Sequence, residues 1–179
     1  MKSYDRLYDE AIGRYGLITV QQARKLGISN AALVNLARRG RLERLGYGLY
    51  RIDKYVPNPD GLDAYACAVA HVGSNAFIWG PSVLAIHRLC PTSPSHIYVA
   101  TPKRYRGKLP PGIVMKNAVC TALGNHEGIP IQNIPDAILA SQHTIMLDRL
   151  LSAAQEAERR GLIGSSERER ITRELYHHD

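Results

Sequence analysis

The residues best suited to chemistry lie between positions 29 and 47, and they offer hydrogen bonds and positive charge. Asn30 and Asn35 carry side-chain amides that can pair with an adenine edge, and Arg38 can reach guanine or a phosphate. Ser29 and the first amides of a helix beginning there can hold a phosphate, because a helix N-terminus attracts anions. These residue types predict a duplex nucleic acid as ligand.

Further candidates follow directly in the sequence. Arg39, Arg41 and Arg44 lie where a helix gives way to a hairpin, and we expect them to contact the DNA backbone without reading bases. Tyr47, at the tip of that hairpin, is placed to touch sugar or to enter the minor groove. The predicted DNA-binding set is therefore Ser29, Asn30, Asn35, Arg38, Arg39, Arg41, Arg44 and Tyr47.

The charge distribution agrees with a polyanionic partner for this part of the chain. Of 179 residues, the first 55 contain eleven Lys and Arg against five Asp and Glu, an excess of six. The remaining residues carry twelve bases and eleven acids, so they are nearly neutral. A basic excess confined to one small module is typical of a nucleic-acid-binding domain.

Three helices are predicted to position these side chains. Apolar residues recur at steps of three and four over residues 4–15, which predicts an amphipathic helix that Gly16 ends. Thr19 and Gln22 have capping-box spacing for a second helix that Gly27 stops. Ser29 caps a third helix through Arg39, with Gly40 as its left-handed C-terminal residue.

A hairpin completes the arrangement. The segments 42–45 and 49–52 are strand-like and flank a Gly-Tyr-Gly turn at residues 46–48, where both glycines allow the positive φ of a tight hairpin. Three helices followed by a hairpin is the order of a winged helix-turn-helix. The helix-turn-helix presents its last helix to the major groove.

The rest of the chain predicts a second domain of mixed structure. The segment KYVPNPD, residues 54–60, has no periodicity and resembles a linker. Beyond it we expect a helix capped by Asp60, strands near 76–79, 96–101, 113–116 and 129–132, and helices from Pro81 and Pro135. The tail is helical, with capping-box spacing from Ser166 to Glu169. The predicted fold class is α+β: a winged helix-turn-helix at 1–54, a linker at 55–58, and an α+β domain at 59–179.

Enzymatic, metal-dependent and membrane functions have little support. Cys67, Cys90 and Cys120 are too dispersed for a disulfide framework or zinc knuckle, and they fit a reducing cytoplasm. The chain has no phosphate-binding glycine loop with Lys, no HExxH and no nucleophile elbow. No apolar run is long enough to span a bilayer, and the first residues lack the apolar region of a signal peptide. We expect a cytoplasmic protein that is not an enzyme, with no cofactor and no metal.

A basic loop in the second half allows two interpretations. Lys103, Arg104, Arg106 and Lys108 surround Tyr105 in a Pro- and Gly-containing stretch. Such a charge run is usually a solvated loop. The alternative is a second nucleic-acid or partner surface.

The N-terminal third resembles a known family. The stretch GLITVQQARKLGISNAALVNLARRGRLERLGYGLYRI has Gly-x-Ile-Thr before the second helix, Gly-Ile-Ser before the third, and a wing ending in Gly-Leu-Tyr-Arg. These features resemble the N-terminal domain of the AbiEi family, the antitoxins of type IV toxin–antitoxin systems. A basic residue is common at the wing tip in relatives, whereas this chain has Tyr47.

More loosely, the resemblance extends through the second domain. It is carried by GPSVLAIHRLCPTSPSHIYVATPKRYRGKLPPGIVM, EGIPIQNIPDAIL and RRGLIGSSERERI. Where relatives have Arg-Thr-Leu, this chain has Asp136, Ala137 and Ile138. The resemblance therefore does not carry a role for that arginine over to this chain.

The resemblance implies a repressor that binds inverted repeats in its own promoter. It also implies an antitoxin whose second domain counters a nucleotidyltransferase toxin without forming a stable complex with it. Two alternatives stay open: a stand-alone transcriptional regulator without a toxin, and a nuclease or DNA-modifying enzyme that uses the winged helix for targeting.

Overall fold

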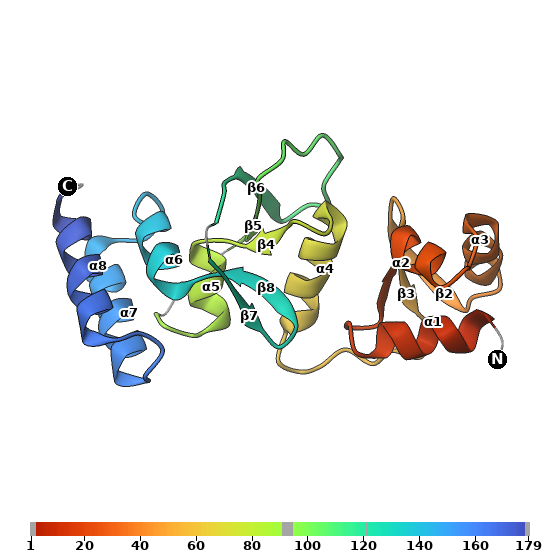
Figure 1. The fold of residues 1–179 in the computed structure, drawn as a ribbon, viewed down its shortest axis with the longest axis horizontal. Coiled ribbons are helices and arrows are strands. Elements are labelled where there is room, and N and C mark those ends of the chain that lie inside the picture. The colour runs from red at the N-terminus through yellow and green to blue at the C-terminus, as the bar shows by residue number, and fades with distance from the viewer. Residues whose placement is uncertain (1–2, 91–94, 121, 178–179) are drawn as a thin grey trace. The chain divides into compact units, whose positions relative to one another are not determined.

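The structure, a computed structural model, describes residues 3–90, 95–120 and 122–177. It divides into two compact units, residues 1–74 and residues 75–179. Each unit is α+β, as the sequence predicts (Figure 1). Within the described residues, no helix combines the length and apolar character needed to cross a bilayer.

The first unit contains four helices and a three-stranded antiparallel sheet. The helices are α1 (Ser3–Ile12), α2 (Val20–Lys25), α3 (Asn30–Arg38) and α4 (Leu62–Val72). The strands are β1 (Leu17–Thr19), β2 (Leu42–Gly46) and β3 (Leu49–Ile52), in the order β1-β3-β2. Because β3 lies in the centre, it holds the hairpin and the N-terminal segment in one sheet.

One apolar core joins α1, α2, α3 and this sheet. Leu7, Ile18 and Leu33 are fully buried, and Ile52 is almost so. They come from α1, β1, α3 and β3, so this core holds the helices and the sheet together. The apolar stripes expected on the helices are therefore the faces that pack.

Two details of this unit differ from the sequence prediction. Helix α1 ends at Ile12 rather than near Tyr15, because Tyr15 and Gly16 both adopt left-handed backbone conformations. Strand β1 was not predicted. It is only three residues long, and its pairing partner, Arg51 to Leu49, lies thirty or more positions away in the sequence.

Helix α4 begins one residue later than an Asp60 cap would place it. The residue before the helix is Gly61, in a left-handed conformation, and the Asp60 carboxylate accepts a hydrogen bond from the Leu62 amide at 3.0 Å. Asp63, in the first turn, accepts a hydrogen bond from the Asn58 amide at 2.9 Å. Both carboxylates therefore shape the entry to the helix.

The second unit has a five-stranded mixed sheet. Its strands are β4 (Phe77–Ile78), β5 (Ile97–Thr101), β6 (Ile113–Asn117), β7 (Leu123–His126) and β8 (Ile129–Gln132), in the order β6-β5-β4-β8-β7. β5 and β6 pair in parallel, as do β4 and β8, while the other two pairings are antiparallel. β7 was not predicted, because its sequence LGNH lacks strand-forming residues and it lies at the sheet edge.

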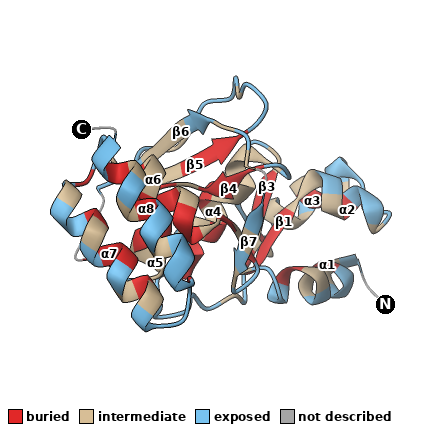
Figure 2. Ribbon diagram, turned by 60° about the vertical axis from the view of Figure 1, so that its left-hand side comes forward, coloured by how far each residue is buried: buried red, intermediate tan, exposed pale blue. Residues whose placement is uncertain are grey.

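Four helices accompany this sheet. They are α5 (Pro81–Ile86), α6 (Ile134–Ala140), α7 (Leu147–Arg159) and α8 (Ser165–His177). The last two of them, α7 and α8, pack on α6. In Figure 1, α5 and α6 lie nearer the sheet, and α7 and α8 form the outer layer of this unit. Figure 2 shows the buried residues concentrated in β4, β5 and the inner helix faces.

Helix caps in this unit explain two sequence features. The amide of Asp136 donates to the Asn133 side chain at 2.9 Å, and the Asp136 carboxylate accepts from Asn133 Nδ2 at 2.7 Å. Asp136 therefore stabilises the start of α6 at the position where the resembled family has Arg. The predicted cap at Ser166 is wrong: α8 begins at Ser165, and Glu167 accepts from the Gly164 amide at 3.0 Å.

Candidate nucleic-acid interface

The turn between α2 and α3 sets the direction of α3. The predicted capping box is present: Thr19 Oγ1 accepts from the Gln22 amide at 3.2 Å, and Gln22 Oε1 accepts from the Thr19 amide at 2.8 Å. Gly27 turns the chain in a left-handed conformation, and the Ile28 amide donates back to Ala23 at 2.9 Å. The buried Ile28 then anchors the turn, so α3 starts at a fixed angle to α2.

Ser29 caps α3 as the sequence predicts. Its Oγ accepts a hydrogen bond from the Ala32 amide at 3.2 Å, and the residue itself is exposed. The hydroxyl hydrogen is still able to donate, because an N-cap interaction uses only the oxygen. Ser29 therefore caps the helix and also keeps a hydroxyl donor on an exposed residue.

The outer face of α3 carries the predicted base-reading residues. Leu33 is fully buried beneath the helix, while Asn30, Asn35 and Arg38 are exposed. At 100° per residue, positions 30, 31, 34, 35 and 38 share one side of the helix. The structure thus brings the two amides and the guanidinium onto one exposed surface, which we call the α3 face.

Arg39 and Arg44 extend positive charge beyond this face. Both are exposed, and neither forms an ion pair with another described residue. Arg39 is the C-cap of α3, and Arg44 lies on β2, where its Nε donates to the Gly46 carbonyl at 3.3 Å. Their cationic groups stay available to a phosphate.

Arg41 has a different environment. Its guanidinium stacks 4.0 Å from the centre of the Tyr4 ring and lies 3.3 Å from Asp53 Oδ2. The Tyr4 hydroxyl also donates to Asp53, and burial together with that carboxylate raises the pKa of Tyr4. Arg41 therefore ties α1 to the ends of β2 and β3, which leaves it less free for phosphate than Arg39 or Arg44.

The wing tip presents Tyr47 fully to solvent. Gly48 has φ +67°, so it supplies the left-handed residue that the turn needs. Gly46 is not in that region, which contradicts the expectation for both glycines. Its side-chain position is instead occupied: a Cβ there would lie 2.6 Å from Cε1 of His71.

Three residues of α2 were missed as candidates. Gln21, Arg24 and Lys25 are exposed on the helix that precedes the turn. The first helix of such a motif crosses the DNA backbone, where cations and amides contact phosphate. In the sequence, these three polar residues alternate with the apolar positions Val20, Ala23 and Leu26. This helical repeat predicts that they are exposed, and it could have identified them as candidates.

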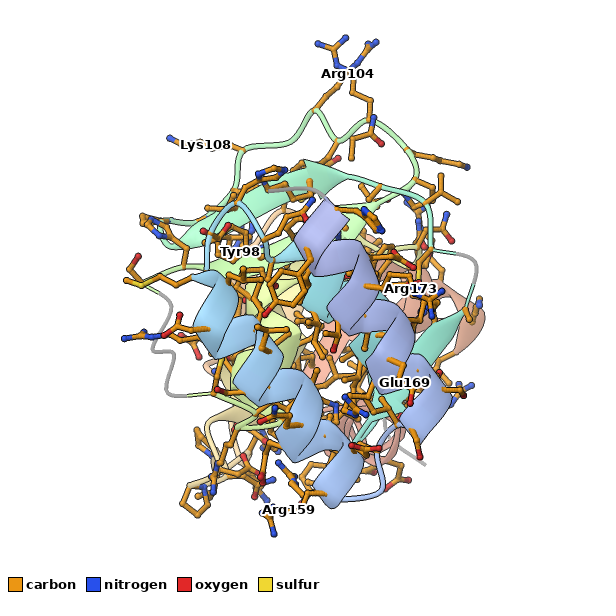
Figure 3. All side chains as sticks on the ribbon, turned by 90° about the vertical axis from the view of Figure 1, so that its left-hand side faces the viewer. Tyr98, Arg104, Lys108, Arg159, Glu169 and Arg173 are labelled. Carbon is orange, nitrogen blue, oxygen red and sulfur yellow. The ribbon has the colours of Figure 1, made fainter. Side chains whose placement is uncertain are left out.

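The second unit carries the basic loop as an exposed feature. Lys103, Arg104, Arg106 and Lys108 are all exposed and form no ion pair with any described residue. Figure 3 shows Arg104 and Lys108 extending from the loop away from the sheet. The geometry fits both interpretations given above.

The described residues contain no group of three or more His, Cys, Asp or Glu placed to hold a metal ion. A helix-turn-helix followed by a two-stranded wing on a three-stranded sheet is a winged helix-turn-helix.

A comparison with known protein families shows which winged helix-turn-helix proteins this part of the chain is similar to. Residues 5–52 match the family model described as "Transcriptional regulator, AbiEi antitoxin". This part of the chain, from the first turn of α1 to the end of β3, is therefore similar to the AbiEi antitoxin regulators. A search of curated proteins found no match.

Proposed function

We propose that this protein is a sequence-specific, double-stranded-DNA-binding repressor. In this proposal the α3 face lies in the major groove, with Asn30, Asn35 and Arg38 reading base edges. Arg39 and Arg44 contact the backbone on either side, and Tyr47 reaches the adjacent groove or sugar. The exposed amide–guanidinium surface on a capped, rigidly oriented helix is the observation that carries it.

The family match supports a more specific role. We propose that the protein represses its own operon by binding inverted repeats, and that it is the antitoxin of a type IV system whose toxin is a nucleotidyltransferase. Two copies of the winged helix would occupy one operator, because an inverted repeat presents two half-sites. Toxin and antitoxin would act without a stable complex, in the cytoplasm.

The experiment is a footprint of the purified full-length protein on the DNA upstream of its gene. The expected result is protection of two inverted half-sites, lost when Asn35 and Arg38 are both replaced by Ala. Protection without any sequence preference, or none, contradicts the proposal. Arg173→Ala is the matched control, because Arg173 is an exposed arginine on α8 without an ion pair to a described residue (Figure 3).

The alternatives give different results in simple assays. A stand-alone regulator shares the DNA site but has no neighbouring gene whose product arrests growth. Co-expression of the adjacent gene with and without this protein separates the two functions. A nuclease would cut the footprinted duplex when divalent metal is added, whereas the repressor leaves it intact.

A further inference from the structure

The wing tip is held between two helices of the first unit. On one side, the Val20 amide at the start of α2 donates to the Gly48 carbonyl at 2.9 Å. On the other, the His71 ring at the end of α4 lies against Gly46, where an added Cβ would come within 2.6 Å of Cε1 and 2.9 Å of Nδ1. The two glycines that flank Tyr47 are therefore each anchored by a different helix.

The contact between α4 and the wing sheet extends along one face of the helix. Asp63, Cys67 and His71 follow each other at intervals of four residues, so they share one side of α4. Asp63 lies beside Tyr55, whose ring packs on Gly16 where β1 begins. Burial raises the pKa of the Cys67 thiol, while Arg51 and Glu43, on the two wing strands, are near enough to add smaller opposing effects. The face thus runs from the entry of α4 to the tip of the wing.

Position 46 requires glycine because of the contact with His71, and not because of its backbone conformation. It has no left-handed φ, so any residue could adopt its conformation if the His71 ring were absent. Burial lowers the pKa of His71, so at neutral pH its ring is uncharged and suited to packing on a backbone. A glycine opposite an imidazole is a close fit that holds the strand at a fixed distance from α4.

We propose that His71 is a positioning residue for DNA binding: it fixes the wing so that Tyr47 meets the duplex when the α3 face occupies the major groove. Helix α4 is then a working part of the DNA-binding unit, although the family match ends at Ile52. This inference rests on the proposed function for its DNA-binding consequence. The wing restraint itself does not depend on DNA.

The test uses the full-length protein and five variants: Gly46→Ala, His71→Ala, Tyr47→Ala, and the two double variants that combine His71→Ala with each of the others. Gly46→Ala is expected to raise the Kd for the operator duplex by about threefold or more. In the His71→Ala background the same change is expected to cost nothing further, because the ring it would collide with is gone.

A second cycle shows whether His71 acts through the wing tip. His71→Ala raises the operator Kd when Tyr47 is present and leaves it unchanged when Tyr47 is already Ala. Equal losses in both backgrounds would mean a general structural role and overturn the proposal. His143→Ala, at an exposed histidine in the second unit, is the matched control.

A measurement without DNA separates this inference from the proposed function. Amide hydrogen exchange at residues 44–49 is expected to be faster in His71→Ala than in the unmodified protein, with exchange in α3 unchanged. Unchanged exchange at the wing overturns the inference. If the wing exchanges faster but no variant or parent binds the upstream duplex specifically, the proposed function fails and the wing restraint stands.

Discussion

Asn35 and Arg38 lie one turn apart on the α3 face, where both side chains are exposed and the buried Leu33 fixes the helix beneath them. Replacing either by Ala is expected to weaken operator binding by ~1–3 kcal/mol, because a bidentate base contact is lost. Binding to unrelated duplex should change much less. Competition gel shifts with operator and scrambled DNA measure both, and an equal loss on the two DNAs would place these residues on the backbone.

The arginines near the wing are expected to divide into two roles. Arg44→Ala should reduce the slope of log Kd against log salt by about one, because one phosphate contact is removed, and leave thermal unfolding unchanged. Arg41→Ala should in addition lower the midpoint of thermal unfolding, since Arg41 stacks on Tyr4 and pairs with Asp53. Equal melting of the two variants would show that the Tyr4–Arg41–Asp53 cluster does not stabilise the fold.

At the scale of single residues, the sequence indicated which side chains would be exposed, but not which of them would pair with other side chains of the protein. Helical periodicity placed Asn30, Asn35 and Arg38 opposite the apolar stripe, and the structure has them there. The environment of Arg41 could not be read from the sequence. Its partners Tyr4 and Asp53 lie far from it along the chain, and only the folded core brings them together.

At the scale of elements, the sequence predicted best those features that a few neighbouring residues determine, such as helix caps. The capping box at Thr19 and the cap at Ser29 were predicted and are present. β1 and β7 were missed, because both are short strands whose existence depends on pairing with β3 and β8. At the start of α8 the sequence allows a cap from Ser166 to Glu169 or one from Gly164 to Glu167. The structure has the second, in which the Gly164 amide donates to Glu167.

That competition leads to a direct test. Glu167→Ala is expected to lower the free energy of unfolding by about 0.5–1 kcal/mol, because its carboxylate accepts from the Gly164 amide at the N-terminus of α8. Ser166→Ala should have no measurable effect, as that residue is exposed within the helix. Urea unfolding of both variants measures the difference. A larger loss for Ser166→Ala would restore the cap that the sequence predicted.

At the scale of the whole molecule, the sequence places the division between domains at 55–58, and that division stays a prediction. The structure groups α4 with the winged helix in the first compact unit. The segment KYVPNPD reads as a linker because nothing in it is periodic. Yet Tyr55, near the start of this segment, packs on Gly16, and His71, near the end of the helix that follows it, packs on Gly46. Contacts across long sequence separations therefore hold both the segment and α4 to the winged helix.

Stability against acid is a property of the whole chain to which one half-buried histidine, His87, makes a distinct contribution. Burial first, and then the nearby His126 and Arg160, lower the pKa of His87 to about 4. The His126 ring centre is 4.7 Å away, and Arg160 donates to the His87 carbonyl. In the unfolded chain the imidazole titrates near 6.5. Between these values the unfolded state binds a proton that the folded state does not.

The sign of the effect follows from that difference in bound protons. The contribution of His87 to stability is fully present above about pH 6.5 and is lost as the pH falls toward 4. His87→Gln cannot titrate, so its free energy of unfolding should fall less steeply over this range than that of the unmodified protein. Urea midpoints measured at several pH values give the slope, and His143→Gln, at an exposed site, is the control. Parallel curves for the parent and His87→Gln would show that His87 is charged as readily in the folded chain as in the unfolded one.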